Sequence, residues 1–307
     1  MSVAPQPVTH PATATGIAPA PATDIAPTAF RGRIGRDARS GHYAVPRRYR
    51  LYLSTACPQG LRIAVAHSLL GLGDSCPVTF LPAVPDCPGG GHTALRPLYE
   101  AGAHHYAGPA LAPVLGDDWS GRIVSTHAPD ILRDLDRHFG DGGAPLYPRG
   151  AEAEIEAVER LCAHGIERAA QRAGRADAEP GERAAALSVL LAALDGLEGR
   201  LAAGRQYLTG DHLTAADVEL FVCLVQLDTV HRHHLDARAV HRVAGHPALW
   251  AYARRLAAHP AFGAHLDLDG IARRHHARCR GLEAAGAAVQ ILDWTAHADG
   301  GRPTHAD

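Results

Sequence analysis

The hydrophobic residues of this chain change their period once, near the middle, and that change limits the folds that are possible. Up to about residue 139, segments in which apolar and polar residues alternate are mixed with segments of helical spacing. After a connection rich in Gly and Pro over residues 140–150, only helical spacing continues. Because alternation is typical of strands and a spacing of three and four is typical of helices, we expect an α/β part followed by an all-α part. The length of 307 residues fits two such domains.

The first part, residues 30–145, has the element order of a thioredoxin-like domain. Pro58 suits the first turn of a helix, and Gly and Asp residues over 116–121 favour a hairpin turn. In order, the pattern predicts a strand over 49–54, a helix beginning at Pro58, a strand over 76–81, a hairpin of 111–115 with 122–125, and a helix over about 129–139. This order, βαβ followed by ββα, predicts the thioredoxin-like fold for the domain.

The second part, residues 146–283, is expected to be a helical bundle. Leucines recur at helical spacing over 187–201, and Thr214 with Asp217 forms a capping-box pattern at the start of another helix. Further helices are predicted after His246-Pro247 and after Asp267. The Pro- and Ala-rich residues 1–29 are expected to be a disordered tail, and residues 284–307 a flexible one.

Composition excludes several classes of protein. All 30 basic residues are Arg, so a P-loop lysine, a kinase lysine and a Schiff-base mechanism are excluded. A net charge of -2 does not indicate the basic surface that nucleic-acid binding requires. No apolar run reaches the roughly 18 residues that span a bilayer. The six Cys have no CxxC or zinc-ribbon spacing, which predicts reduced thiols and a cytoplasmic protein.

Cys57 lies between a predicted strand and a predicted helix, where backbone N–H groups converge and the helix dipole favours an anion. A thiol in this position is expected to have a lowered pKa and to act as a nucleophile. Gly60 stands where a CxxC motif would have its second Cys, so the chemistry should be monothiol, with an external thiol completing the cycle. The other cysteines considered are expected to be small buried side chains: Cys76, Cys162, Cys223 and Cys279.

Several segments in order carry a resemblance to a known family. These are RYRLYLSTACPQGLR around Cys57, Ala112-Pro113-Val114-Leu115, Gly121-Arg122-Ile123-Val124, Leu146-Tyr147-Pro148, Tyr207-Leu208-Thr209-Gly210-Asp211, LTAADVELF with Leu227-Asp228, and HPALWAYARRL. Together they resemble the glutathionyl-hydroquinone reductases, the Xi class of the glutathione transferase superfamily. The similarity extends roughly from Phe30 to Cys279.

The resemblance implies a glutathione transferase fold, usually as a homodimer, with a thioredoxin-like domain ahead of an all-helical domain. In that family a cysteine thiolate attacks the sulfur of a glutathionyl-hydroquinone, forms a mixed disulfide and releases the hydroquinone, and a second glutathione frees the enzyme. By position, Cys57 would be the nucleophile. Pro113 would be the cis-proline, and the backbone of Ala112 would pair with the tripeptide.

The sequence departs from the family around the expected thiol site. The family motif C-P-W-A is CPQG here, with Gln59 beside the nucleophile, and His127-Ala128 replaces Glu-Ser at the start of the closing helix. Losing a charged hydrogen bond costs about 1.5–3 kcal/mol, which would weaken glutathione binding by one to two orders of magnitude. The cofactor is therefore glutathione or another small thiol such as mycothiol. The remaining candidate for its binding is Arg62, one turn after Cys57.

The expected substrate is a small aromatic thiol conjugate, and Glu167, His231 and His275 stand nearest to the positions of the family's quinone-site tyrosines. No metal site is predicted, because histidines at spacings of one and two, as in His231, His233 and His234, do not share a helical face. Two alternatives remain. The chain is a non-catalytic binding protein of the transferase fold that has lost thiol recognition, or its histidines form a metal-dependent site.

Overall fold

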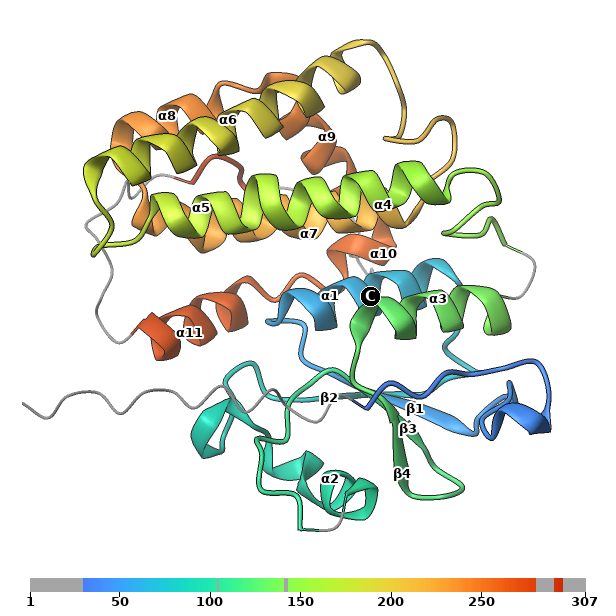
Figure 1. The fold of residues 1–307 in the computed structure, drawn as a ribbon. Helices are drawn as coiled ribbons and strands as arrows, with labels where there is room; N and C mark the ends of the chain where they lie inside the picture. Colours follow the sequence, from blue (N-terminus) through green and yellow to red (C-terminus); the bar gives the residue numbers. More distant parts are fainter. Residues whose placement is uncertain (1–29, 104, 141–142, 280–289, 295–307) are drawn as a thin grey trace, which may run out of the picture.

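A computed structural model describes residues 30–103, 105–140, 143–279 and 290–294. The described chain forms a sheet-containing domain and a helical domain that pack against each other, as Figure 1 shows. This arrangement confirms the expected fold class, a thioredoxin-like domain followed by an all-helical one. Residues 1–29 lie outside the described residues, so the predicted tail there stays a prediction.

The sheet has four strands in the order β2-β1-β3-β4. Strand β1 (Tyr49–Leu53) pairs in parallel with β2 (Val78–Phe80) and antiparallel with β3 (Val114–Asp117), which forms the predicted hairpin with β4 (Arg122–Ser125). The side chains of β1 alternate strictly in burial, as expected for a strand with two different faces. Tyr49, Leu51 and Leu53 belong to the main core, whereas Tyr52 packs on a smaller cluster across the sheet.

Helices cover both faces of this sheet. Helices α1 (Pro58–Leu69) and α3 (Ala128–Phe139) lie between the sheet and the helical domain, and α2 (Arg96–Gly102) lies on the opposite face (Figure 1). The smaller cluster contains Tyr99 of α2 with Val114 and Ile123 of the sheet. Helix α2 was not predicted, because seven residues that include Pro97 and Gly102 are too short to show a helical period.

The helical domain begins with α4 (Glu152–Arg160), a π-helical turn (Leu161–Glu167) and α5 (Arg168–Ala173), which follow one another directly. Then come α6 (Pro180–Ala202), α7 (Ala215–Thr229), a 3-10 turn (His231–His234), α8 (Ala237–Ala244), α9 (Pro247–Ala257), α10 (Pro260–Gly263) and α11 (Leu268–Cys279). The predicted capping box of Thr214 and Asp217 is present at the start of α7. Within the described residues, none of these helices combines the length and the apolar character that a membrane crossing needs.

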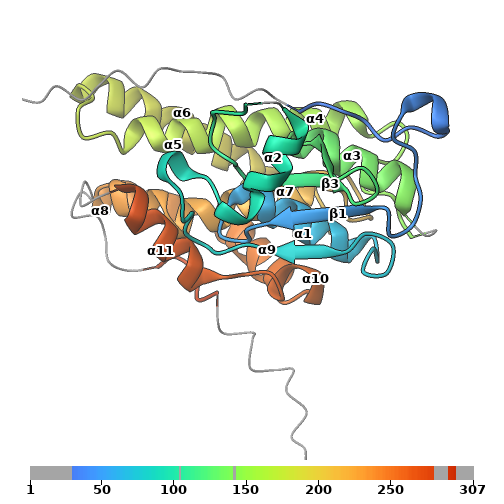
Figure 2. The ribbon, with the colours of Figure 1, turned by 90° about the horizontal axis from the view of Figure 1, so that it is seen from below.

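The two domains share one hydrophobic core. Helix α1 packs on α7, and buried side chains run without interruption from β1 through α1 to α6 and α7. Polar contacts add to this interface, because Arg133 of α3 reaches Glu159 of α4 at 3.2 Å. Figure 2, seen from the side of α2, shows α10 and α11 along the edge of the molecule opposite to α3 and α4. Helix α11 therefore approaches the sheet domain from the edge opposite to α3 and α4.

Residues 290–294 differ from the expected flexible tail over 284–307. Leu292 and Trp294 are 2% and 4% exposed, and the Trp294 ring meets Phe221 edge to face. The carboxylate of Asp228 accepts hydrogen bonds from the backbone N–H groups of Ile291 and Leu292 and from Trp294 Nε1. For these five residues the expectation is wrong, because a buried carboxylate and an aromatic cluster hold them. The other residues of 284–307 lie outside the described part of the chain.

Candidate active site between the domains

A cavity of about 780 Å³ lies between the two domains. Its sheet-side wall is formed by Ala56, Cys57, Pro58 and Gln59, and its helical wall by the segment from the π-helical turn to residue 177, the end of α7 with the following 3-10 turn, and α11. The cavity brings together five of the residues predicted from the sequence: Cys57, Gln59, Glu167, His231 and His275. The volume is in the range that holds a small organic ligand.

Cys57 is placed by backbone hydrogen bonds at the junction of β1 and α1. Its N–H donates to the Ser54 carbonyl at 3.0 Å, and its carbonyl accepts the first helical hydrogen bond, from Leu61 N–H at 2.8 Å. The residue is the N-cap of α1, with Pro58 as the first helical residue, as predicted. The thiol donates to Gln59 Oε1 at 3.5 Å. The sulfur therefore lies in the cavity wall at the positive end of a helix dipole.

The cavity also contains several cationic side chains. Arg175, Arg274 and Arg278 line it, and Arg274 Nη1 donates to the Ala83 carbonyl across the domain boundary at 3.1 Å. Burial lowers the pKa of Arg274, and its attraction to Cys57 opposes that shift. Asp177 balances Arg175 through an ion pair of 2.6 Å, so Arg274 and Arg278 give the cavity its positive character. An anionic conjugate is the kind of ligand that such a cavity attracts.

Arg62 lies behind the cavity wall instead of lining the cavity. Its Nη2 is 2.8 Å from Glu167 Oε1 and 2.8 Å from Glu219 Oε1, and the guanidinium is largely buried. Burial raises the pKa of Glu219 to about 7, helped by repulsion from Glu167 and Glu159 and opposed by Arg62. Arg62 thus holds Glu167 in the cavity wall, and two carboxylates compete for its charge.

The other predicted thiol-binding residues lie elsewhere in the sheet domain, outside the cavity lining. The peptide bond between Ala112 and Pro113 is cis, as the resemblance implies. His127 is the N-cap of α3, with its Nδ1 3.0 Å from Asp130 Oδ2, and Ala128 is the first residue of the helix. The residues predicted to bind the thiol thus fall into two sets, one in or behind the cavity wall and one beside β3 and α3.

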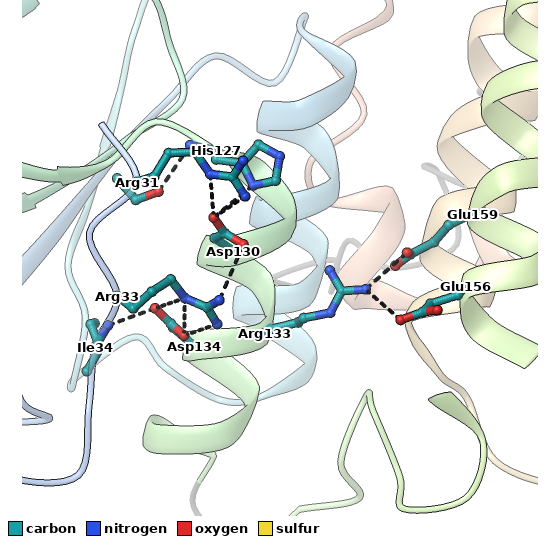
Figure 3. A network of polar contacts seen from close by, with 10 residues as sticks. Arg31, Arg33, Ile34, His127, Asp130, Arg133, Asp134, Glu156 and Glu159 are labelled. Carbon is teal, nitrogen blue, oxygen red and sulfur yellow. Dashed lines mark hydrogen bonds and ion pairs between the residues drawn. The ribbon is translucent and has the colours of Figure 1, made fainter. Parts of the chain in front are cut away.

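Residues 31–34, ahead of β1, pack against the first turns of α3. Arg31 Nε donates to Asp130 at 2.9 Å, Arg33 makes a bidentate pair with Asp134, and Ile34 N–H donates to Asp134 at 2.8 Å (Figure 3). Sequence reasoning did not find this network, because its partners lie about 100 residues apart. The charge at the start of α3 is therefore set by Arg31 and Asp130 together with His127.

The helical wall carries an imidazole-rich cluster. Burial, together with His234 and His275, lowers the pKa of His231 to about 4, so this imidazole is neutral at physiological pH. Cys279 Sγ lies 3.3 Å from His275 Nδ1 and 3.7 Å from His234 Nε2. The expectation that Cys279 is a buried apolar side chain is wrong, because it ends α11 at the cavity wall.

The remaining cysteines agree with their predicted role as small core residues. Cys76, Cys162 and Cys223 are each fully buried, and burial raises the pKa of Cys76 to about 12. All six cysteines lie in the described part of the chain, and none of them forms a disulfide. Cys57 and Cys279 are the two that line the cavity.

Comparison with known proteins decides the family. Residues 180–255 match the model of the glutathione S-transferase C-terminal domain. Over 248 residues the chain is 32% identical to the glutathionyl-hydroquinone reductase PcpF of Sphingobium chlorophenolicum, covering 75% of this chain and 77% of that protein. The chain belongs to the glutathionyl-hydroquinone reductases. They form the Xi class of the glutathione transferases, as the sequence resemblance indicated.

Solved structures of an Xi-class transferase and of a glutathione transferase homologue agree with this membership. The Xi-class transferase of Natrialba magadii matches with a TM-score of 0.73 and 27% identity, covering 87% of this chain and 88% of that one. The glutathione-bound structure of YqjG from Escherichia coli K-12 matches with a TM-score of 0.72 and 25% identity, covering 85% and 94%. This Xi-class protein is thus an enzyme of the glutathione transferase kind.

Proposed function

We propose that this Xi-class enzyme uses Cys57 to reduce the glutathionyl conjugate of a small hydroquinone-like aromatic compound. The Cys57 thiolate attacks the sulfur of the conjugate, and the bond between sulfur and the aromatic carbon breaks. That carbon keeps the electron pair and takes a proton, so a hydroquinone leaves and a mixed disulfide remains on Cys57. A second glutathione thiolate attacks this disulfide, forms oxidised glutathione and restores the Cys57 thiolate.

The observation that carries the proposal is the position of Cys57 at the start of α1, in the wall of a cavity of about 780 Å³ between the two domains. A helix N-terminus stabilises the thiolate that the first step needs. The relative PcpF, named a glutathionyl-hydroquinone reductase, supports the choice of substrate. The cytoplasmic location and the homodimer expected from the sequence belong to the same proposal.

The cavity residues suggest separate roles in substrate binding. Arg274 and Arg278 would attract the carboxylates of the tripeptide, and Gln59, 3.5 Å from the Cys57 sulfur, would border the reacting atoms. His231 and His275 would contact the aromatic group. The neutral imidazole of His231 can donate a hydrogen bond to a phenolic hydroxyl or accept one from it. Glu167, held by its ion pair with Arg62, would line the part of the cavity that binds the aromatic group.

The identity of the thiol depends on the sheet domain. Ala112 and Pro113 would present the backbone that pairs with the thiol ligand, and the start of α3 at His127 and Ala128 would face its amino-acid end. His127 near Asp130 and Arg31 is a different recognition surface from the Glu-Ser pair of the family. The proposal therefore includes glutathione or another small thiol, such as mycothiol, as the reductant.

Hydroquinone release from a synthetic glutathionyl-hydroquinone tests this function. The enzyme is mixed with the conjugate and either glutathione or mycothiol, and the hydroquinone is quantified by liquid chromatography. We expect turnover that Cys57→Ser reduces at least about 1000-fold, because the nucleophile is lost. Cys87→Ser is the matched control, since Cys87 lies outside the cavity near Thr93 and should retain turnover. A folded wild-type enzyme that releases no hydroquinone with either thiol would favour the non-catalytic binding protein.

A further inference from the structure

Three side chains meet on the helical wall of the cavity: His234, His275 and Cys279. The proposed reaction gives them no joint role. His234 belongs to the 3-10 turn after α7, and His275 and Cys279 belong to α11. Their potential ligand atoms, one from each residue, all lie within 4.8 Å of one another. The centroids of the His234 and His275 rings are 5.0 Å apart and the rings are nearly perpendicular, in an edge-to-face contact.

The two sulfur–nitrogen distances in this cluster match those around a tetrahedral metal ion. With a zinc–sulfur bond of about 2.3 Å and a zinc–nitrogen bond of about 2.05 Å, a tetrahedral angle separates sulfur and nitrogen by about 3.5 Å. The sulfur of Cys279 is 3.3 Å from His275 Nδ1 and 3.7 Å from His234 Nε2. The two imidazole nitrogens lie within 4.8 Å of each other, whereas a tetrahedral site separates them by about 3.3 Å, so a zinc ion fits once the imidazole rings rotate toward it.

The backbone holds these side chains in place. His275 and Cys279 are four residues apart on α11, a spacing that puts both on one face of a helix. The 3-10 turn of His234 is fixed by its neighbour Arg232, whose Nε donates to the Asp228 carbonyl at 2.7 Å and whose guanidinium is 3.3 Å from the Asp228 carboxylate. Asp228 also binds residues 291–294, so this turn is tied to the buried core.

We propose that His234, His275 and Cys279 form a binding site for a single zinc ion, with a fourth coordination position open to the cavity. Two imidazoles and one thiolate are a donor set that zinc prefers over magnesium or calcium. All three residues line the cavity, so a water molecule or a sulfur or oxygen atom of a ligand can reach the fourth position. Binding exchanges the Cys279 thiol proton for the metal ion and releases that proton to solvent.

The sequence predicted no metal site and left one built from histidines as an alternative, without Cys279, because the ligands come from two segments 41 residues apart and Cys279 was expected in the core. His231 and His233, the other members of the histidine run, are not part of the three-residue cluster. Arg278, next to Cys279, also lines the cavity and opposes a cation there. The negative charge of the Cys279 thiolate offsets this repulsion. Of the three proposed ligands, only His275 also has a place in the proposed substrate site.

Cobalt(II) titration of the untagged full-length protein tests the site. The protein is freed of metal with a chelator, kept reduced without oxygen and titrated with cobalt(II), which gives a thiolate charge-transfer band and intense visible bands in a tetrahedral site. We expect both signals to saturate at one equivalent and to disappear when zinc displaces cobalt. Cys279→Ser should remove the charge-transfer band, and His234→Ala or His275→Ala should weaken affinity at least about 100-fold.

Matched variants separate this site from adventitious binding. His276→Ala changes the adjacent exposed histidine of α11, and Cys57→Ser removes the other cavity thiol; both should bind cobalt as the wild type does. Circular dichroism confirms that each variant is folded. A wild-type protein that gives no thiolate band at one equivalent, or a band that persists in Cys279→Ser or is lost in Cys57→Ser, would overturn the proposal.

Discussion

The two walls of the cavity are built by different forces. On the sheet side, Cys57 is held by the hydrogen bonds of a strand and a helix over a continuous apolar core. On the helical side, the lining residues depend on buried charges, with Arg62 between Glu167 and Glu219 and Asp228 beside Arg232. Backbone hydrogen bonds do not titrate at ordinary pH, whereas Glu219 does, because burial raises its pKa to about 7. The nucleophile should therefore keep its place over a range of conditions in which the substrate wall loosens.

The largest effect is expected on stability, from loss of the Asp228 carboxylate that anchors the helical wall. Asp228→Ala should lower the free energy of unfolding by about 3–5 kcal/mol, because the buried Arg232 guanidinium loses the Asp228 carboxylate and three N–H donors lose their acceptor. Urea unfolding measures the loss. Asp195→Ala is the control, since the Asp195 side chain is 75% exposed and should contribute less than about 1 kcal/mol. Equal, small effects of the two variants would contradict the difference between the walls.

The pH dependence of stability is the next test of that difference. Burial raises the pKa of Glu219 from its usual 4.5 to about 7, so between these values the folded protein keeps a proton that the unfolded chain has released. The free energy of unfolding therefore falls as pH rises through this window, by up to about 3 kcal/mol. Glu219→Gln should remove that part of the fall, as measured by urea unfolding at pH 4.5 and 7.5.

The control for Glu219 is Glu156, whose side chain is 52% exposed at the surface of α4. Glu156→Gln should show the same pH dependence as the wild type, because an exposed carboxylate gains little from its neighbours. If Glu219→Gln and the wild type lose the same stability over this range, the raised pKa of Glu219 is not the cause of the fall.

Glutathione binding on the sheet side can be strengthened by restoring the family residues. The double change His127→Glu and Ala128→Ser supplies an acceptor for the γ-glutamyl ammonium and a hydroxyl at the start of α3. We expect the dissociation constant for glutathione to fall about 10- to 100-fold in isothermal titration calorimetry. Ala128→Ser alone should give only part of this gain. An unchanged affinity would show that the start of α3 does not hold the γ-glutamyl group.

The smallest effect is expected from the cation that crosses the cavity. Arg274 lines the helical wall and donates to Ala83 on the sheet side. Arg274→Gln should slow mixed-disulfide formation with oxidised glutathione, an anion, about 5- to 10-fold at low salt and less at high salt. The reaction is quenched at a series of times, and intact-protein mass spectrometry of each sample gives the rate of mixed-disulfide formation. Arg242→Gln on the exposed face of α8 should leave them unchanged, and a salt-independent loss in Arg274→Gln would point to a role other than attraction.

The sequence predicted what local patterns encode. The alternation over 49–53, Pro58 at the helix start and the capping box at Thr214 each depend on neighbours within a few positions, and the structure confirms all three. The cis bond before Pro113 came from the family resemblance and is also present. Helices α2 and α8 were missed, because each has eight residues or fewer and shows too little of a helical period.

What the sequence could not predict depends on contacts between distant segments. The docking of Trp294 on Phe221, the pairing of Arg33 with Asp134 and the meeting of His234 with Cys279 join residues between 45 and 101 positions apart. Arg62 illustrates the same limit. Its place one turn after Cys57 suggested that it faces the thiol, but the folded chain provides two carboxylates that hold it behind the cavity wall.

Intact-protein mass spectrometry tests the central claim, that Cys57 is the thiol that exchanges with a small-molecule disulfide. The wild type, Cys57→Ser and Cys87→Ser are incubated separately with oxidised glutathione and oxidised mycothiol. The account predicts one added thiol moiety on the wild type and on Cys87→Ser, its absence in Cys57→Ser, and a preference for one of the two thiols. A folded wild type that gains no adduct from either thiol, or an adduct that persists at the same level in Cys57→Ser, would contradict it.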